Sequence, residues 1–393
     1  MIPVQKSFGE VVLFARTGLN PRTNFKLGQG TNKYITIKNI HNNTLVIDDA
    51  TDVVDDAAIS MIHRRSQIKA GDILFCSIGR LGDMYIIKEE PVGWDVNESV
   101  FVFTLDTSII RQKYFYYLFK HRDIIEYLTA NSSGSTFKSI KMNQLQKMVF
   151  DLPSLAEQDK IVACLDSVTE TIEIRSQQLL TLDTLIKARF VEMFGVFPEN
   201  PMGWETGTIR DVVSDVRYGS SRPAVEGGKY PYLRMNNITY GGELDLTDTK
   251  RIDVPESELE KCTVRRGDVL FNRTNSKELV GKTCVYNRNE MMVLAGFVIR
   301  VRLNERMLPE FLSAFLNTDF SKAMLLGMCK AAIGQANINA QEMQSIGIYI
   351  PPIEKQREFV LFKAQIEKSK AAVQQSLAES QLLFDSLMQK YFG

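Results

Sequence analysis

The 393-residue sequence has few of the residues that mark metal sites, disulfides and membrane spans. Its three histidines, His41, His63 and His121, show no metal-ligand spacing. The five cysteines are scattered without a Cys-x-x-Cys pair, which favours reduced thiols over a disulfide framework or a zinc site. No apolar run approaches the roughly 20 residues of a membrane span. These absences predict a cytoplasmic chain without a metal ion.

Motifs of common catalytic centres are also missing. The Asn/Asp-Pro-Pro-Tyr/Phe tetrapeptide of amino-methyltransferases has no match, and the nearest candidate is IPPI at residues 350–353. Gly281-Lys282-Thr283 is similar to the end of a P-loop, but Ser276 stands where that loop needs its first glycine. We therefore expect no catalytic centre in this chain and no cofactor bound to it.

Positive and negative charges balance over the whole chain, with 47 Lys and Arg against 47 Asp and Glu. A neutral chain is not the uniformly basic kind that binds polyanions without specificity. The charges are sorted locally, however, because residues 16–47 contain no acid and an acidic run follows at residues 48–56. A basic face can therefore exist on a neutral molecule.

Internal repetition organises the sequence. Residues 152–158 (LPSLAEQ) return as residues 350–356 (IPPIEKQ), and AGDILF at 70–75 returns as RGDVLF at 266–271. A third pair, KNI at 38–40 and NNI at 236–238, lies in the same order. The chain is therefore a tandem duplication.

Each half has a globular part followed by a helical part. The globular parts are rich in short strand-like runs broken by Gly, Asn and Pro, such as residues 34–37, 84–87 and 298–301. Helical stretches at 112–128 and 309–326 interrupt these runs. We predict an α+β fold with two mixed, mostly β domains. The predicted boundaries are 1–151 and 196–349 for these domains, and 152–195 and 350–393 for the helical segments.

The helical parts show the 3.5-residue apolar period of a coiled coil. About forty residues at 1.5 Å each span about 60 Å. This length exceeds a small domain and favours pairing of the two helices over an amphipathic helix lying on its own globule. The predicted seam residues are Ile161, Leu165, Val168, Ile172, Leu179, Leu182, Ile186, Ile366, Val373, Leu377, Phe384 and Leu387.

Two details of the helices add expectations. The polar residues Arg175, Lys370 and Ser380 fall on the seam, where they would fix the register or contact a partner. Phe190 and Phe392 align at a larger offset than the other motif pairs, so we expect the second helix to be about one turn longer.

Together these features resemble the specificity subunit of type I restriction–modification systems. Two variable globules are each followed by an LPxLxxQ or IPPIxxQ turn and a long helix, over essentially the whole chain. Residues 217–221 (RYGSS) and 230–238 (YPYLRMNNI) look like the opening of a target recognition domain, and residues 267–275 (GDVLFNRTN) look like its middle. Each motif alone is weak, whereas their duplicated order is specific.

The resemblance implies two target recognition domains separated by two long antiparallel coiled-coil helices, with pseudo-two-fold symmetry. Each domain would read one half of a bipartite double-stranded DNA site, and the site would be asymmetric because the domains differ. Two modification (methyltransferase) subunits would dock on the helices, and restriction (endonuclease/translocase) subunits would join them. S-adenosylmethionine, ATP and Mg²⁺ would belong to these partners, and this chain would be non-catalytic.

Candidate DNA-binding residues lie in acid-poor loops at matching places in the two halves. Arg suits guanine and Asn or Gln suits adenine, because each makes a two-pronged contact in the major groove, while other contacts go to phosphates. The candidates are Arg16, Asn20, Arg22, Asn24, Lys26, Lys138, Lys141, Tyr218, Ser220, Arg222, Arg234, Asn236, Arg273, Asn275, Gln335 and Asn337.

Two other interpretations remain open. The chain could be the DNA-reading subunit of a differently organised restriction system, which its partner genes would reveal. It could also be a coiled-coil scaffold without DNA binding, although the matching loops of the two halves argue against this. A self-contained methyltransferase or nuclease is opposed by the missing motifs.

Overall fold

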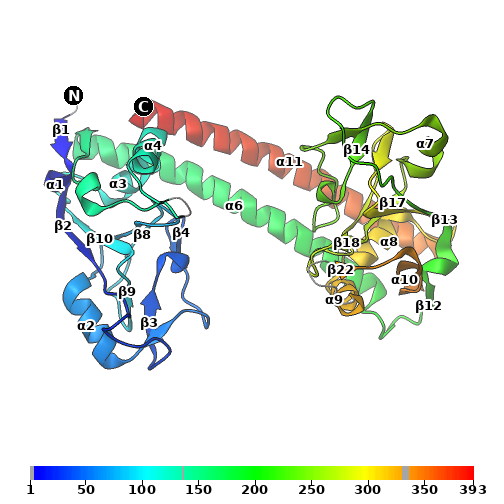
Figure 1. Ribbon diagram of the computed structural model, residues 1–393, viewed down its shortest axis with the longest axis horizontal. Coiled ribbons are helices and arrows are strands. Elements are labelled where there is room, and N and C mark those ends of the chain that lie inside the picture. Colours follow the sequence, from blue (N-terminus) through cyan, green and yellow to red (C-terminus); the bar gives the residue numbers. More distant parts are fainter. Residues whose placement is uncertain (1–3, 135–136, 330–335) are drawn as a thin grey trace. The chain divides into compact units, whose positions relative to one another are not determined.

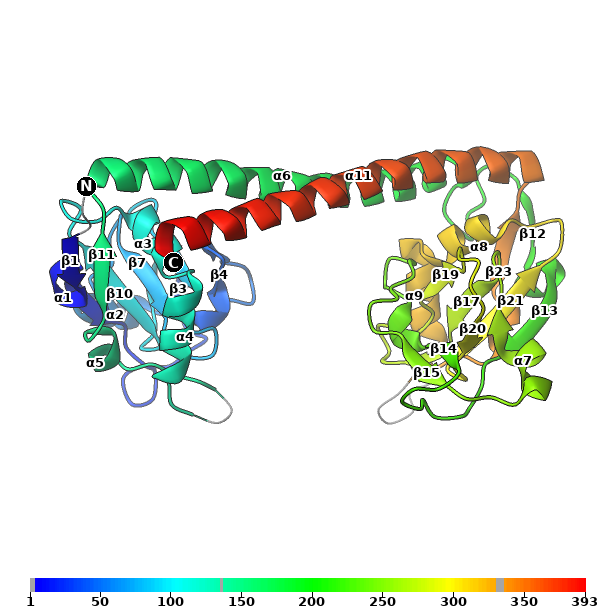
Figure 2. The same ribbon diagram turned by 90° about the horizontal axis from the view of Figure 1, so that it is seen from above.

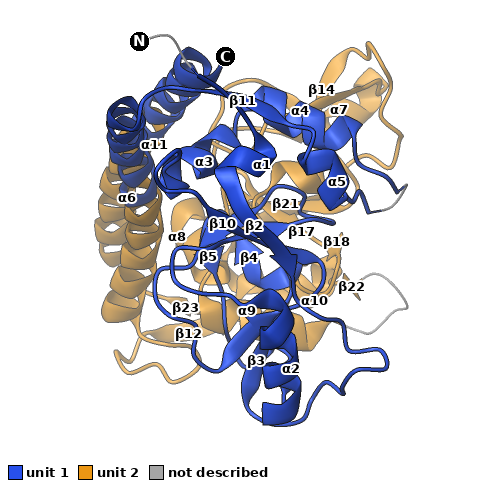
Figure 3. Ribbon diagram, turned by 90° about the vertical axis from the view of Figure 1, so that its left-hand side faces the viewer, with its two compact units in different colours: residues 1–174, 376–393 blue, residues 175–375 orange. Residues whose placement is uncertain are grey.

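The computed structural model describes residues 4–134, 137–329 and 336–393, and it divides into two compact units. Unit 1 comprises Met1–Ile174 and Ser376–Gly393, and unit 2 comprises Arg175–Gln375. Figure 3 colours the two units and shows that each contains one globular domain and a part of both long helices.

The centre of unit 1 is a four-stranded antiparallel sheet in the order β2-β10-β7-β8 (Figure 1). Its strands are Val12–Thr17, Val100–Leu105, Ile73–Cys76 and Met84–Ile86. Side chains alternate across the pleat, so Phe75 of β7 enters the core shared with the helices, whereas Leu74 enters the opposite core with Ile35. Both faces are covered, which explains the continuous apolar runs of β7 and β10.

A smaller sheet in unit 1 has the order β6-β3-β9, formed by Val53–Val54, Asn32–Ile35 and Trp94–Val96. Helix α2 (Asp56–Ser66) packs Ile62 against Tyr34 of this sheet. The remaining elements of unit 1 are β1 (Val4–Ser7), α1 (Phe8–Val11), η1 (Ile37–Asn39), β4 (Ile40–His41), β5 (Thr44–Leu45), α3 (Gln112–Leu118), α4 (Arg122–Ala130), α5 (Met142–Leu145) and β11 (Val149–Leu152).

Unit 2 repeats this arrangement (Figure 2). Its central sheet has the order β13-β21-β17-β19, formed by Val213–Tyr218, Val298–Leu303, Val269–Asn272 and Thr283–Val285. Its second sheet has the order β15-β14-β20-β16, formed by Lys250–Ile252, Tyr230–Leu233, Met292–Leu294 and Thr263–Val264. The parallel pair β14–β20 corresponds to β3–β9 of unit 1. The predicted duplication and the α+β fold class are confirmed.

Most of the remaining elements of unit 2 also have counterparts in unit 1. The remaining elements are β12 (Glu205–Thr208), η2 (Ile209–Val212), η3 (Met235–Asn237), α7 (Glu256–Cys262), β18 (Thr274–Asn275), α8 (Pro309–Leu316), α9 (Asp319–Met328), β22 (Ala336–Asn337), α10 (Ala340–Gln344) and β23 (Gly347–Ile350). The pair β18–β22 corresponds in unit 1 to a single bridge between Ile78 and Ser139. Each of the two predicted helical stretches is a pair of short helices, α3–α4 in unit 1 and α8–α9 in unit 2.

Two 40-residue helices, α6 (Leu155–Phe194) and α11 (Ile353–Phe392), run through both units. The expectation that the second helix is longer is therefore wrong. The aligned phenylalanine Phe190 is not the last residue of α6, because this helix continues for one more turn and ends before Gly195, whose φ is +78°. A glycine in the left-handed conformation is a common helix end.

Within unit 2 the long helices are antiparallel. Arg189 near the end of α6 lies 3.4 Å from Glu358 near the start of α11, and Asp183 lies 2.7 Å from Lys370, further along α11. All predicted seam residues of both helices are buried or half-buried. No helix in the described parts of the chain has both the length and the apolar character of a membrane span.

The repeated glutamine of the LPSLAEQ and IPPIEKQ turns attaches each long helix to its domain. Gln158 is fully buried; its side-chain oxygen accepts from the backbone N–H of Arg111 at 2.9 Å, and its amide donates to two backbone carbonyls at 3.0 Å. Gln356 accepts from the N–H of Leu308 at 2.8 Å and likewise donates to two carbonyls at 2.8 Å. Arg111 and Leu308 are the N-caps of α3 and α8, so the same attachment is built twice.

Candidate nucleic-acid interface

Four of the predicted DNA-binding residues meet on the surface of unit 2. Strand β18 pairs with β22, which brings the loop after β17 beside Ala336–Asn337. The guanidinium carbon of Arg273 lies 4.8 Å from the centre of the Tyr218 ring, and the Tyr218 hydroxyl accepts a hydrogen bond from the N–H of Ala340 at 2.9 Å. Stacking of this kind covers the flat face of a guanidinium and leaves its N–H edge able to donate. We call Tyr218, Arg273, Asn275 and Asn337 the Arg273 cluster.

The corresponding loops of unit 1 carry Arg80, Phe137 and Lys138. Ile78 pairs with Ser139, which matches the pairing of β18 with β22 in unit 2. Arg80, Phe137 and Lys138 line one surface depression together with His41, and the Phe137 side chain is 66% exposed. The sequence analysis missed Arg80. Its place in the repeat could have revealed it, because it follows β7 as the loop with Ser276 follows β17.

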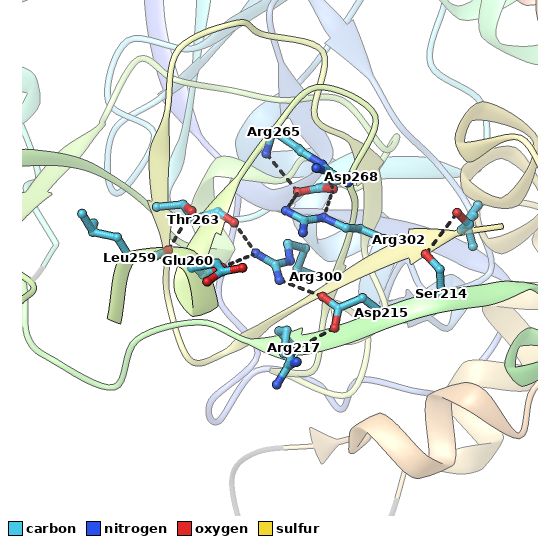
Figure 4. Close-up of polar contacts among 11 residues, drawn as sticks. Ser214, Asp215, Arg217, Leu259, Glu260, Thr263, Arg265, Asp268, Arg300 and Arg302 are labelled. Carbon is cyan, nitrogen blue, oxygen red and sulfur yellow. Dashed lines mark hydrogen bonds and ion pairs between the residues drawn. The ribbon is translucent and has the colours of Figure 1, made fainter. Parts of the chain in front are cut away.

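Arg16 serves the fold of unit 1. Its Nη2 lies 3.1 Å from Oδ2 of Asp72, whose side chain is 1% exposed. Burial raises the pKa of Asp72, and hydrogen bonding by Thr104 and the charge of Arg16 oppose this shift. In unit 2 the equivalent buried carboxylate, Asp268, pairs with an arginine from a different strand. Nε of Arg302 on β21 lies 2.8 Å from Oδ1 of Asp268 (Figure 4).

Both aspartates also accept the backbone N–H of the residue three positions earlier. This turn explains why Gly-Asp recurs in both halves. Figure 4 shows a second internal arginine, Arg300, which is 2% exposed and donates to Asp215 at 2.8 Å. Arginines of the central sheets therefore divide into those that hold the fold and those that face solvent.

Three other predicted residues of unit 2 already have partners. Ser220 is 7% exposed, and its backbone N–H and carbonyl are both hydrogen-bonded within the unit. Arg222 forms a two-pronged ion pair with Glu258 at 2.7 and 3.2 Å, and Arg234 pairs with Asp248 at 2.9 Å. Exposed ion pairs of this kind contribute only about 0–1 kcal/mol, so a phosphate group could compete for either arginine.

The repeated KNI and NNI motifs separate a structural residue from an exposed one. Asn237 is 2% exposed; its side-chain oxygen accepts the N–H of Arg234, and its amide donates to the carbonyl of Asp245 at 2.8 Å. Asn39 makes the equivalent bonds in unit 1. The preceding residues, Asn236 and Lys38, are exposed. The first position of each motif is thus available for contacts and the second is not.

The remaining candidates of unit 1 lie in two loops. Asn24 donates to the carbonyl of Asn20 at 2.9 Å, which shapes the loop between β2 and β3. Arg22 and Lys26 of the same loop are exposed. Lys141 is exposed at the start of α5. No described contact joins the loop between β2 and β3 to Lys138. Gln335 lies outside the described residues.

Cysteine and histidine side chains are potential reactive groups in the part of the chain that the structure describes. Burial raises the pKa of the Cys76 and Cys284 thiols to about 12, so neither is a thiolate at neutral pH. His63 and His41 lie 3.1 Å from Asp95 and Asp83. Residues 4–134, 137–329 and 336–393 contain no group of three or more His, Cys, Asp or Glu that could hold a metal ion.

A duplicated α+β domain with one helix attachment built twice, and with exposed Arg, Lys and Asn side chains on matching loops, defines a two-domain recognition protein. Its family follows from a sequence comparison. Residues 4–183 and 201–379 match the model of the type I restriction modification DNA specificity domain, and the chain belongs to this family. The resemblance inferred from the repeated motifs is confirmed.

Curated relatives are specificity subunits of type I restriction enzymes. The EcoKI subunit of Escherichia coli K12 is 24% identical over 285 residues, which cover 67% of this chain and 61% of that protein. The EcoBI subunit of Escherichia coli is 20% identical over 382 residues, which cover 85% of this chain and 79% of that protein. The chain thus spans less than two thirds of the EcoKI subunit.

Two solved structures share the fold over the full length of this chain. One is a chain from a study of complex assembly and conformational transition in a type I restriction–modification system, with a TM-score of 0.57, 20% identity and 98% of that chain covered. The other is the type I restriction–modification S subunit of M. genitalium, with a TM-score of 0.55, 14% identity and 99% covered. Both likenesses establish the fold.

Proposed function

We propose that this chain is the DNA sequence-reading subunit of a type I restriction–modification complex and has no catalytic activity of its own. The observation that carries the proposal is the duplicated specificity domain with different exposed side chains at equivalent loops. Lys38 of unit 1 corresponds to Asn236 of unit 2, and Arg80 corresponds to the Ser276 loop. Because the two domains differ at these positions, we propose an asymmetric bipartite site.

The proposed contacts follow from exposure. In unit 2 the N–H edge of Arg273 suits guanine, and the amides of the exposed Asn236 and Asn337 suit adenine. In unit 1, Arg22, Lys26, Lys38, Arg80, Lys138 and Lys141 are exposed cations that suit phosphates or guanine. We leave Arg16 and Ser220 out of this set, because internal hydrogen bonds already use their polar groups.

The long helices supply the proposed docking surface for two modification subunits. On α6, Leu180 is 60% exposed and Leu185 is 44% exposed, and on α11 Leu361 is 71% exposed. Exposed apolar side chains in series on a helix are typical of a protein–protein contact. S-adenosylmethionine, ATP and Mg²⁺ belong to the partner subunits in this proposal, restriction subunits complete the nuclease, and the assembly acts in the cytoplasm.

The test is co-expression with the modification subunit of the same system, followed by base-resolution mapping of methylation in the host DNA. We expect a bipartite, asymmetric adenine motif that disappears when this chain is omitted. A complex that assembles with the modification subunit but adds no methylation to DNA would overturn the proposal and favour the scaffold interpretation.

A further inference from the structure

Lys370 carries a buried ammonium group where α6, α11 and the domain of unit 2 meet. The residue lies on the otherwise apolar seam of α11 and is 5% exposed. Its Nζ lies 2.7 Å from Oδ1 of Asp183 on α6, 2.6 Å from Oε1 of Glu243 in the domain, and 3.5 Å from Oε2 of Glu367 on its own helix. We call these four residues the Lys370 cluster. It joins both long helices to the domain.

The charge of Lys370 is maintained by its partners. Burial alone would lower the pKa of this lysine, but the hydrogen bonds to Asp183 and Glu243 raise it above its ordinary value. The acids are each partly exposed, at 54% for Asp183 and 47% for Glu243. The lysine is thus permanently charged and held at one point by groups from three elements.

This contact is remote from the main attachment of the domain. The aromatic core of unit 2 packs Phe190 of α6 against Phe311 and Phe359, with ring centres 5.4 and 5.2 Å apart, beside the Gln356 attachment. Lys370 lies three helical turns beyond Phe359, or about 16 Å along α11 at 1.5 Å per residue. The domain is therefore held to the helices at two separated places.

Between these two places lies a cavity of about 360 Å³, lined by α6, α8, α9, α11 and the loop that carries Glu243. Side chains across a cavity exert no packing constraint on each other. An ion pair between Lys187 and Asp319 also crosses this region at 2.8 Å, but its side chains are 53% and 83% exposed, and such pairs contribute little. The Lys370 cluster, whose lysine is 5% exposed, is thus a second contact between the domain and the helices, separate from the main attachment.

The loop that carries Glu243 is itself held in place. Lys322 donates to the carbonyl of Tyr240 at 3.1 Å and lies 4.1 Å from the centre of its ring. Gly242 has a φ of +86°, and a Cβ there would lie 2.4 Å from Nδ2 of Asn317. A loop this tightly packed transmits the position of Glu243 to the rest of the domain.

We propose that Lys370 is a positioning residue that fixes the angle of the second target recognition domain on its helices and thereby narrows the range of gap lengths that the chain accepts. The inference rests on the proposed function, in which two half-sites are read across a gap. It is specific to unit 2, because α6 carries the apolar Ile172 at the same distance from its glutamine.

The experiment uses the complex with modification subunits and duplexes that carry both mapped half-sites. The gap is varied one base pair at a time around its natural length, and a duplex with only the second half-site is included. For Lys370→Met we expect the preference for the natural gap over its neighbours to fall by a factor of about 3 to 30. Affinity for the single half-site should stay within about twofold of the parent.

Two further variants test the ion pair with Glu243 and provide a control. Glu243→Gln should reproduce the loss of gap preference, because it removes the charge on the domain side. Lys368→Met is the matched control and should leave the preference intact, because this lysine is exposed on α11 and lies outside the Lys370 cluster. If Lys370→Met does not fold, Glu243→Gln alone decides the question.

An unchanged gap preference in folded Lys370→Met or Glu243→Gln complexes would overturn the inference. Its failure is distinguishable from failure of the proposed function. If the proposed function is wrong, binding by the parent complex will depend on neither the half-sites nor the gap length. If only the inference about Lys370 is wrong, binding by the parent complex will still depend on the half-sites and on the gap length.

Discussion

The ring of Tyr218 packs against the guanidinium group of Arg273, with 4.8 Å between the ring centre and the guanidinium carbon. The Tyr218 hydroxyl accepts a hydrogen bond from the N–H of Ala340, which holds the ring in place. The two residues come from strand β13 and from the loop after β17, so the pair also ties two segments of the interface together. An arginine held in this way pays less rotamer entropy when it binds a base than a free one does.

Arg273→Ala should weaken binding to the natural site by about 1–3 kcal/mol and relax selectivity at one base pair of the second half-site. Tyr218→Phe keeps the ring and should have a smaller effect of the same kind. The measurement is competition binding against duplexes substituted at each position. Arg288→Ala, at an exposed arginine outside the predicted loops, is the control. Uniform weakening across all substituted duplexes would mean that Arg273 contacts phosphate.

Arg80 and Lys138 of unit 1 should behave as phosphate contacts. Each alanine substitution should lower affinity for all sequences about equally and reduce the slope of log K against log salt by about 1. Binding isotherms at several salt concentrations measure this slope. The exposed Lys88, which is outside the candidate loops, gives the control substitution. A slope equal to that of the parent protein would show that neither Arg80 nor Lys138 contacts a phosphate group.

Gln158→Ala should destabilise unit 1 by about 2–4 kcal/mol, because it leaves one partly buried N–H and two partly buried carbonyls without their partner. The chain has two tryptophans, Trp94 in unit 1 and Trp204 in unit 2, so urea unfolding followed by fluorescence in single-tryptophan variants reports on each unit separately. Gln356→Ala should act on the Trp204 transition in the same way. The exposed Gln146→Ala should shift neither.

The contribution of Lys322 to the stability of unit 2 should rise at alkaline pH. Burial, with the charges of Lys187 and Lys282, lowers the pKa of Lys322 from 10.5 to about 8. Between these values the unfolded lysine binds a proton that the folded one has lost, so the free energy of unfolding increases as pH rises through this window. Urea midpoints from Trp204 fluorescence should rise relative to those of Lys322→Met as pH increases. The comparison is with this variant because the buried thiols of Cys262 and Cys284, whose pKa values burial raises, act in the opposite direction in both proteins. The exposed Lys368→Met should retain the slope.

Insertion of one helical turn into both long helices, after Ile174 and before Ser376, should lengthen the gap of the recognised site. Four residues add about 6 Å, which corresponds to about 2 base pairs of duplex. Methylation mapping with the altered chain provides the measurement. Insertion into α6 alone is the comparison, because it leaves α11 unmatched and should impair assembly. A site with its original gap would contradict the role of the helices as a spacer.

The duplication, the strand-rich domains and the long helices could all be predicted, because each leaves a local pattern in the sequence. Gly-Asp and the glutamine turn recur at matching places, and the structure shows why: Asp72 closes a turn, and Gln158 holds the start of a helix. The motifs that recur in both halves are thus those whose side chains hydrogen-bond to the backbone.

The candidate site was only partly predictable, because exposure depends on partners distant in the chain. Arg16 lies in an acid-free stretch, yet its partner Asp72 is 56 residues away. Conversely, Arg80 lies next to a buried strand and gave no signal by composition, although the repeat places it on the matching loop. Local sequence separates neither an internal arginine from an exposed one nor Asn237 from Asn236.

The glutamine attachment has a consequence for how such proteins change. Gln158 and Gln356 bind their domains through backbone atoms, so this part of the joint does not depend on the side chains on the domain side. A domain exchanged at these turns keeps the backbone atoms that bind the glutamine. It should fit the other position, or another family member, once its side-chain contacts with the helices, such as that of Glu243 with Lys370, are matched. Recombination at the two turns would then create new specificities from existing parts, while point substitution in the loops would refine them.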